Sequence, residues 1–312
     1  MWYHYQEEVA FMFKKNKEKV LKNFKNFGFS FGMSFLLSKT ICRRAEYKTR
    51  IKAINILDKE LSPLIKEYED KEPCVLSVTN DQKNIFVFWW DGFDKAPLVV
   101  KNNVLKVQKL YPDYTLFLIG KENYTSYVTL SKEIYAYIAS GNISVQTLSD
   151  ILRVNLLSKY GGFWMDATIR VFHQEPLLTQ IQDSGFYSLN VDCKEKDALW
   201  AKVIPNLGYV TFYMGSAKGN PALAFVRDAF TEYYKKHDFL IDYFLIDYLL
   251  AIAKRHHLGN GSLDSSKHRD GNPFYLTNCV DQGIVPSLSE CEKCPQKLNW
   301  RNSVFNSDII FH

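Results

Sequence analysis

The 312-residue sequence predicts an α/β fold with a mainly parallel sheet flanked by helices. Two short and almost continuously apolar runs, at 84–90 and 114–120, have the length of buried strands. Segments with helical periodicity alternate with these runs, which is typical of parallel sheets with helices on both faces. In such sheets ligands bind at the carboxyl ends of the strands, so the residues that follow each strand are candidates for a functional site.

The first 70 residues are predicted to be helical and basic. Residues 1–52 contain twelve Lys and Arg against four Glu, a net charge of +8, whereas the rest of the chain carries −3. Basic residues among aromatic ones suit a helix on an anionic membrane surface, and of the anionic partners we expect the membrane and no nucleic acid. The alternative is a helical layer packed on the main domain. We expect 1–75 to form this N-terminal segment and 76–312 the main domain.

The remaining elements follow from the same periodicities and from signals at helix ends. Pro97 opens a helix predicted at 96–110, and Asn220-Pro221 form the N-cap and first turn of another that extends to about 236. Further helices are expected near 131–139, 147–160 and 242–255, and further strands at 163–165, 186–190 and 208–214. Abundant Gly, Asn, Ser and Asp predict a loop at 258–275.

Composition limits the class of protein. Hydrophobic residues make up 46% and charged residues 23%, which excludes a disordered or fibrous chain. Six cysteines are too few for a disulfide scaffold, and the N-terminus lacks the pattern of a secretory signal, so we expect the reducing cytoplasm. Cys291 and Cys294 form one CxxC pair, which Cys279 and His268 could extend to a zinc site, although loop cysteines are the more ordinary interpretation.

The most informative window is 144–172. Asp150 and Arg153 lie three residues apart and project together from one predicted helix, which the Gly161-Gly162 pair ends. A short apolar strand then places Asp166 at its end, with Thr168 on the same side of the pleat. Three ordinary interpretations stay open: Asp150 in a capping box with Thr147, Arg153 in an intrahelical ion pair, and Asp166 as a turn residue.

This window resembles a known family. The run SDILR at 149–153, then LLSKYGG and WMDAT at 164–168, is similar to the donor-binding core of retaining glycosyltransferases of the GT-A fold. The nearest match is the capsular polysaccharide synthesis glycosyltransferases, and related enzymes end this segment in DxD. The segment 85–96 and the DYF sequence at 242–244 resemble further motifs of the family. The resemblance covers about 84–250 and implies a GT-A (Rossmann-like) domain.

The resemblance also implies roles for individual residues. Asp150 and Arg153 would hold the donor sugar, and Asp166 with Thr168 would bind Mn²⁺ or Mg²⁺. Thr168 replaces the second Asp of the DxD relatives, so the protein would contribute less charge to the ion. The other residues expected to bind the donor are Trp89, Trp90, Gly92, Tyr160, Lys297 and Trp300.

A third metal ligand or phosphate clamp is expected from the C-terminal part. Lys297 and Trp300 are candidates, as are four histidines, His256, His257, His268 and His312. Asp247 lies within an apolar helix, where a carboxylate is either on a wet face or directed into the cleft. We expect Asp247 to act with Asp150 and Arg153 as a catalytic residue.

The function implied by the resemblance is transfer of a hexose, galactose or glucose, from a UDP-sugar with retention of configuration. The acceptor would be a polyprenyl-diphosphate-linked sugar in capsule or surface polysaccharide synthesis. The enzyme would be cytoplasmic and peripheral on the inner face of the plasma membrane. One alternative is a non-catalytic, membrane-associated scaffold or anion-binding protein that uses the basic N-terminus. A second is a phosphohydrolase that uses the same cation.

Overall fold

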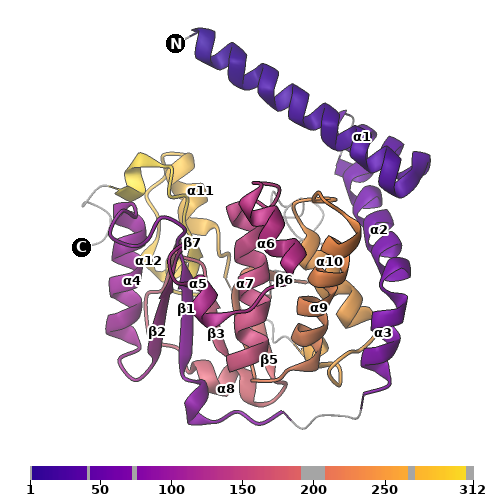
Figure 1. Ribbon diagram of the computed structural model, residues 1–312. Helices are drawn as coiled ribbons and strands as arrows, with labels where there is room; N and C mark the ends of the chain where they lie inside the picture. Colours follow the sequence, from indigo (N-terminus) through magenta and orange to yellow (C-terminus); the bar gives the residue numbers. More distant parts are fainter. Residues whose placement is uncertain (1, 41–42, 72–75, 191–207, 266–270, 307–312) are drawn as a thin grey trace.

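A five-stranded sheet forms the centre of the fold (Figure 1). The computed structural model describes residues 2–40, 43–71, 76–190, 208–265 and 271–306. The strand order is β2 (Thr115–Ile119), β1 (Asn84–Phe88), β3 (Gly162–Met165), β6 (Tyr209–Ser216) and β5 (Phe186–Asn190). β1 pairs in parallel with β2 and β3, and only β6 is antiparallel to its neighbours. Four strands therefore point the same way, which confirms the predicted α/β class with its mainly parallel sheet.

Helices cover both faces of the sheet. Ile85 and Val87 of β1 pack on one face with α4 (Leu98–Leu110), whereas Phe86 and Phe88 pack on the other with α7 (Val145–Tyr160). This division follows from the pleat, because alternate side chains of a strand point to opposite faces. α9 (Pro221–Lys236) lies against α7, and α10 (Leu245–Arg255) lies against α9.

The helix that carries the SDILR sequence begins at Val145, two residues before the predicted start at 147. Ser144 is the N-cap of α7, and its Oγ accepts a hydrogen bond from the Thr147 backbone N–H at 3.1 Å. Thr147 therefore receives its cap from Ser144, and the capping-box interpretation of Asp150 is wrong. Gly161 ends α7 with φ 68°, as the Gly-Gly pair predicts.

Shorter elements complete the described fold. They are α5 (Tyr124–Tyr127), α6 (Lys132–Ala139), α8 (Leu177–Gln182), α11 (Tyr275–Asp281), α12 (Leu288–Cys291) and the strands β4 (Ile169–Arg170) and β7 (Gln296–Lys297). The loop predicted at 258–275 contains a 3₁₀ turn at Ser262–Ser265, and 266–270 lie outside the described residues. Cys279, Cys291 and Cys294 are buried free thiols; His268 is not described.

Three helices form the N-terminal segment: α1 (Trp2–Thr40), α2 (Arg43–Glu60) and α3 (Ser62–Glu69). α1 bends at Gly28, whose φ of 81° is not helical, and its N-terminal end extends away from the body (Figure 1), whereas Phe27, directly before the bend, packs against His237. After the bend Phe31 and Phe35 are buried in the main core, and the guanidinium of Arg50 lies 4.6 Å from the ring centre of Phe244. The end of α1, with α2 and α3, is thus a helical layer on the main domain.

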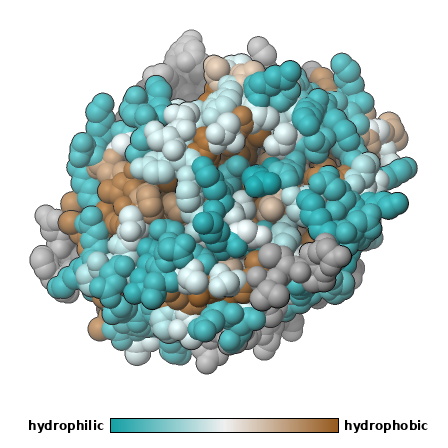
Figure 2. Space-filling view, turned by 60° about the horizontal axis from the view of Figure 1, so that its bottom comes forward, coloured by the Kyte–Doolittle hydropathy of each residue, from teal (hydrophilic) through white to brown (hydrophobic). Residues whose placement is uncertain are grey.

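No helix in the described ranges is both long and apolar enough to cross a membrane. Figure 2 turns the lower end of the sheet toward the viewer, and the surface there is mainly hydrophilic with scattered hydrophobic areas. The first turn of α4 follows β1 at the upper end of Figure 1, which places the carboxyl ends of the parallel strands on the side away from this face.

Candidate functional site

A cleft of about 480 Å³ opens at the carboxyl ends of β1 and β3. Its walls come from the residues that follow β1, the first turns of α7, the residues that follow β3, and the segment from β7 to Arg301. A smaller compartment of about 250 Å³ shares five residues with the cleft and reaches the first turn of α10. The five shared residues are Asp150, Arg153, Asp166, Tyr243 and Lys297. The site therefore lies where the parallel sheet predicts a ligand.

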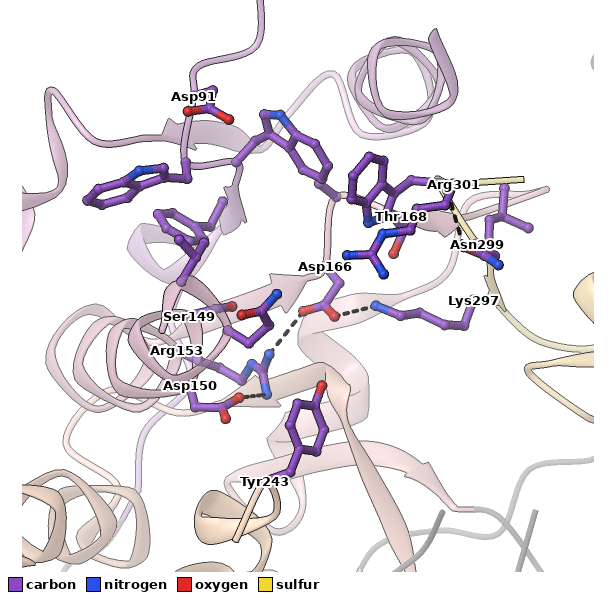
Figure 3. Close-up of a pocket in the computed structure, with 18 residues that line it drawn as sticks. Asp91, Ser149, Asp150, Arg153, Asp166, Thr168, Tyr243, Lys297, Asn299 and Arg301 are labelled. Atoms are coloured by element: carbon purple, nitrogen blue, oxygen red, sulfur yellow. Dashed lines mark hydrogen bonds and ion pairs between the residues drawn. The ribbon is translucent and has the colours of Figure 1, made fainter. Parts of the chain in front are cut away.

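Asp166 lies at the centre of the cleft (Figure 3). Its backbone N–H donates to the carbonyl of Phe212 at 2.9 Å, and its own carbonyl accepts from Ile169 at 2.8 Å, which forms a turn directly after β3. The indole Nε1–H of Trp164 donates to Asp166 Oδ1 at 2.7 Å. Strand, turn and indole together fix the direction of the carboxylate, so Asp166 is a turn residue whose side chain also lines the cleft.

Arg153 connects the two acidic residues of the window. Its Nη1 lies 3.0 Å from Asp150 Oδ1 and its Nη2 lies 3.0 Å from Asp166 Oδ1. The guanidinium is also 5.1 Å from the ring centre of Trp164, and only 4% of the residue is exposed. A buried arginine with two carboxylates is strongly held, since an unpaired charge at this depth would be costly. The predicted convergence of these three residues is confirmed.

Lys297 reaches Asp166 from the opposite side of the cleft to Arg153 (Figure 3). Its Nζ forms an ion pair with Asp166 Oδ2, across 131 residues of sequence. The short antiparallel pairing of β4 with β7 makes this possible, because it sets Lys297 beside Ile169, three residues after Asp166. Leu298 extends the pairing through a hydrogen bond from its N–H to the carbonyl of Thr168 at 2.9 Å.

The carboxylates of the site differ in their proton affinity. Burial raises the pKa of Asp150 to about 7, although Arg153 opposes the rise. Burial and the neighbouring Asp150 raise the pKa of Asp247, which lines the smaller compartment, to about 7. Burial would also raise the pKa of Asp166, but Lys297 and Arg153 outweigh it and hold that pKa below its usual value. Near neutral pH, Asp166 is therefore ionised, whereas Asp150 and Asp247 are in the range where a carboxyl group gains and loses its proton.

Aromatic side chains line the cleft next to its charged groups, among them Phe88, Trp89, Trp90 and Trp300. Trp89 and Trp300 meet edge to face with ring centres 5.6 Å apart, and both line the cleft, as does Trp90. Trp300 is 40% exposed, so this aromatic surface is open to a flat ligand. Trp90 also packs toward Phe88 and Tyr124, with ring centres 6.3 and 6.2 Å away.

Two residues predicted to bind the donor are not among those that line the cleft. Tyr160 is at the far end of α7, ten residues from Asp150 and therefore about 15 Å along the helix axis. Its hydroxyl donates to the carbonyl of Tyr127 at 2.8 Å, and the sequence offered no sign of this structural role. Gly92 is not among the residues that line the cleft; its φ of 80° serves the turn closed by its N–H to the carbonyl of Trp89.

The histidines proposed as ligands do not reach the described site. His256 contacts Asp58 and Glu69, and His257 contacts Asp264, all away from the cleft. His268 and His312 lie outside the described residues. Of the C-terminal candidates, the structure brings Lys297 and Trp300 to the site.

The donors around Asp166 do not suit a divalent cation as they stand. Mn²⁺ and Mg²⁺ prefer several oxygen ligands, whereas this position offers one carboxylate and the hydroxyl of Thr168. Both oxygens of the carboxylate already accept bonds from positively charged or N–H groups. In the described part of the chain, no three His, Cys, Asp or Glu side chains gather closely enough to hold a metal ion. The residues at Asp166 and Thr168 therefore do not fit the expected Mn²⁺ or Mg²⁺ ion, whose binding stays a prediction from the sequence.

Several lining residues escaped the sequence analysis. Asn299 lies between the candidates Lys297 and Trp300, and Arg301 directly follows them, so proximity to Lys297 was the available signal. Tyr243 lies within the DYF sequence and lines both compartments. Trp164 was present in the WMDAT motif, but its hydrogen bond to Asp166 required coordinates.

The fold and the cleft define a ligand-binding α/β protein whose site lies at the carboxyl ends of its strands. Comparison with family models gives the particular family. The model described as "Capsular polysaccharide synthesis protein" matches residues 34–300, and the chain belongs to this family. The family predicted from the motifs is thereby confirmed.

Two curated relatives match shorter stretches. O-glycosyltransferase braB of Annulohypoxylon truncatum is 34% identical over 99 residues, which are 29% of this chain and 23% of that protein. Glycosyltransferase afumC of Aspergillus fumigatus (strain CBS 144.89 / FGSC A1163 / CEA10) is 28% identical over 102 residues, 30% of this chain and 26% of that protein. The chain thus aligns with about a quarter of the length of each relative.

Among solved structures, PaToxG Glycosyltransferase is similar at a TM-score of 0.42 and 16% sequence identity. The match covers 80% of this chain and 92% of that one.

Proposed function

We propose that this protein is a retaining glycosyltransferase that transfers a hexose from a UDP-sugar to a lipid-linked sugar in capsular polysaccharide synthesis. The observation that carries the proposal is the chain of charges Asp150–Arg153–Asp166 at the carboxyl ends of the strands, below an open pair of tryptophans. Membership of the capsular polysaccharide synthesis family and the names of the two curated relatives support it.

The cleft offers a suitable surface for each part of a nucleotide sugar. Trp89 and Trp300 supply an apolar surface for the base. Asp150 and Arg153, which extend into the smaller compartment, present an acceptor and donors for sugar hydroxyls. A diphosphate between these two parts would lie beside Lys297 and Arg301.

The reaction exchanges one bond to the anomeric carbon for another. The bond from this carbon to the UDP oxygen breaks, and a bond to the acceptor oxygen forms on the same face. The electron pair of the broken bond goes to the diphosphate, which also takes the proton of the acceptor hydroxyl. Positive side chains directed at the departing oxygen lower the barrier, because negative charge develops there in the transition state. Asp247 lines the compartment next to Asp150, where it would contact the acceptor.

A screen of UDP-sugars for UDP release tests the proposal. UDP-galactose and UDP-glucose differ at one hydroxyl, so both belong in the panel, with and without a lipid-linked sugar acceptor. Replacing Asp166 with Ala should abolish transfer while the fold stays intact by circular dichroism. Asp113→Asn is a matched control, since Asp113 is exposed and distant from the lining residues. UDP release that survives in Asp166→Ala contradicts the proposal that the chain of charges Asp150–Arg153–Asp166 is needed for transfer.

We further propose that α1 contacts the anionic inner face of the plasma membrane. Leu21 and Phe29, on either side of the bend, are 60% and 72% exposed, and Lys25 is exposed beside them. Exposed apolar side chains among lysines favour the headgroup region of anionic lipids. Liposome flotation should require anionic lipid and weaken at high salt, and the double variant Leu21→Glu, Phe29→Glu should lose it. Equal association with neutral vesicles contradicts this proposal.

A further inference from the structure

The charged groups that line the cleft are evenly matched in number. Asp91, Asp150 and Asp166 line the cleft together with Arg153, Lys297 and Arg301, so three potential negative charges accompany three positive ones; Asp247 lines only the adjoining compartment. A site built for a divalent cation normally carries an excess of carboxylates, since oxygen ligands must compensate two charges. This cleft has no such excess. The even balance suits an incoming diphosphate, whose own negative charge is then the surplus.

Lys297 is held firmly at the position where a cation would contact Asp166. Its backbone is fixed by the pairing of β7 with β4 and by a 2.6 Å hydrogen bond from its N–H to the carbonyl of Pro273. Its ammonium forms an ion pair with Asp166 Oδ2 and lies 5.3 Å from the ring centre of Phe212. The side chain is 25% exposed, so the ammonium is part of the cleft wall rather than a freely moving surface charge.

An ammonium group can replace a metal ion in this setting. The ammonium carries three N–H donors, and the ion pair with Asp166 does not occupy all of them. The remaining donors can bind phosphate oxygens, with lysine acting as a point charge. Arg301 lies on the same side of Asp166 as Lys297 and adds planar donors (Figure 3). Arg153 neutralises the other oxygen of Asp166, so the carboxylate does not need the whole charge of Lys297. The ammonium can therefore also attract a phosphate oxygen.

We propose that Lys297, assisted by Arg301, neutralises the departing diphosphate in place of a divalent metal ion, so that this protein binds UDP and transfers sugar without one. The inference depends on the proposed function, because it assigns the cation of that same site. In the step described above, the electron pair and proton go to the diphosphate as before. The ammonium of Lys297 stays protonated and supplies only charge and hydrogen bonds.

Calorimetry of UDP binding to the full chain tests the inference. We expect the dissociation constant of UDP to be the same in EDTA and in MnCl₂. Lys297→Met should weaken UDP binding about ten- to a hundredfold, the loss of one charge-assisted hydrogen bond, and Lys297→Arg should restore part of it. Lys293→Met is the matched control, because Lys293 pairs with Glu290 and does not line the cleft. Thermal unfolding of each variant checks that the fold persists.

The outcomes separate the inference from the proposed function. UDP binding that requires Mn²⁺ overturns the inference and leaves the glycosyltransferase proposal standing. Unchanged UDP affinity in folded Lys297→Met also overturns it. Absence of UDP binding to the unmodified chain with and without Mn²⁺ overturns the proposed function, and the inference with it. Binding that ignores EDTA but weakens in Lys297→Met, and not in Lys293→Met, supports it.

Discussion

Replacing Asp247 with Asn should stabilise the protein, and the gain should depend on pH. Asp247 lines the smaller compartment, where burial and the neighbouring Asp150 raise its pKa to about 7. Asn has nearly the same shape as protonated Asp but cannot ionise. The substitution therefore removes the cost of a buried negative charge beside another carboxylate.

The size of the gain follows from the raised pKa. Between the unfolded value of 3.8 and about 7, the folded protein binds more protons at this side chain than the unfolded chain, so stability falls as pH rises. Complete ionisation at pH 8.5 corresponds to a loss of at most about 4 kcal/mol relative to the protonated form. Partial exposure of Asp247 reduces this, and we expect a measured gain of about 1–3 kcal/mol for Asp247→Asn at pH 8.5.

Urea unfolding at several pH values from 4 to 8.5 measures this effect. The advantage of Asp247→Asn should be small near pH 4, grow up to about pH 7, and then stay level. Asp113→Asn, at an exposed position, should show no such growth. Parallel stability curves for Asp247→Asn and the unmodified protein over the whole range would refute the reasoning, since they would mean that Asp247 ionises equally in both states.

Three further predictions concern other parts of the molecule. Trp164→Phe removes the N–H that donates to Asp166 and should lower the free energy of unfolding by about 1–3 kcal/mol, measured in urea. Trp89→Ala should weaken UDP binding about tenfold in calorimetry, because the base would stack on the ring, and should leave the binding of inorganic diphosphate unchanged. An equal loss of affinity for both ligands contradicts stacking. Gly28→Ala should cost about 1–2 kcal/mol, since the φ of 81° disfavours any side chain, and an unchanged thermal midpoint would show that the bend is not maintained.

The fold was largely predictable because its elements depend on local patterns. The apolar run at 84–90, the helix opened by Pro97 and the Gly161-Gly162 stop all produce the expected structure within a few residues. Predicted boundaries differ where capping decides, as at Ser144, whose hydroxyl starts α7 before the apolar face begins.

Only those site residues that lie close together in the sequence could be predicted as a group. Asp150, Arg153 and Asp166 lie within 17 residues of one another, and their spacing indicated a shared edge of the sheet. Tyr160 lies in the same window, but it is the last residue of α7 and its side chain contacts Tyr127 instead of the cleft. The position of a residue along the helix, and not its closeness in sequence, decides where its side chain points. Lys297 was only one of several candidates, since its contact with Asp166 depends on the pairing of two very short strands.

That pairing between β4 and β7 makes assembly of the cleft a late event during synthesis. Arg153 and Asp166 emerge from the ribosome close together, but the ammonium that completes the set follows 131 residues after Asp166. A nascent chain that ends before Gln296 would fold its sheet with one oxygen of Asp166 unneutralised. Such a fragment would lack the ammonium that neutralises Asp166 Oδ2, so the last described strand completes the charge balance of the cleft.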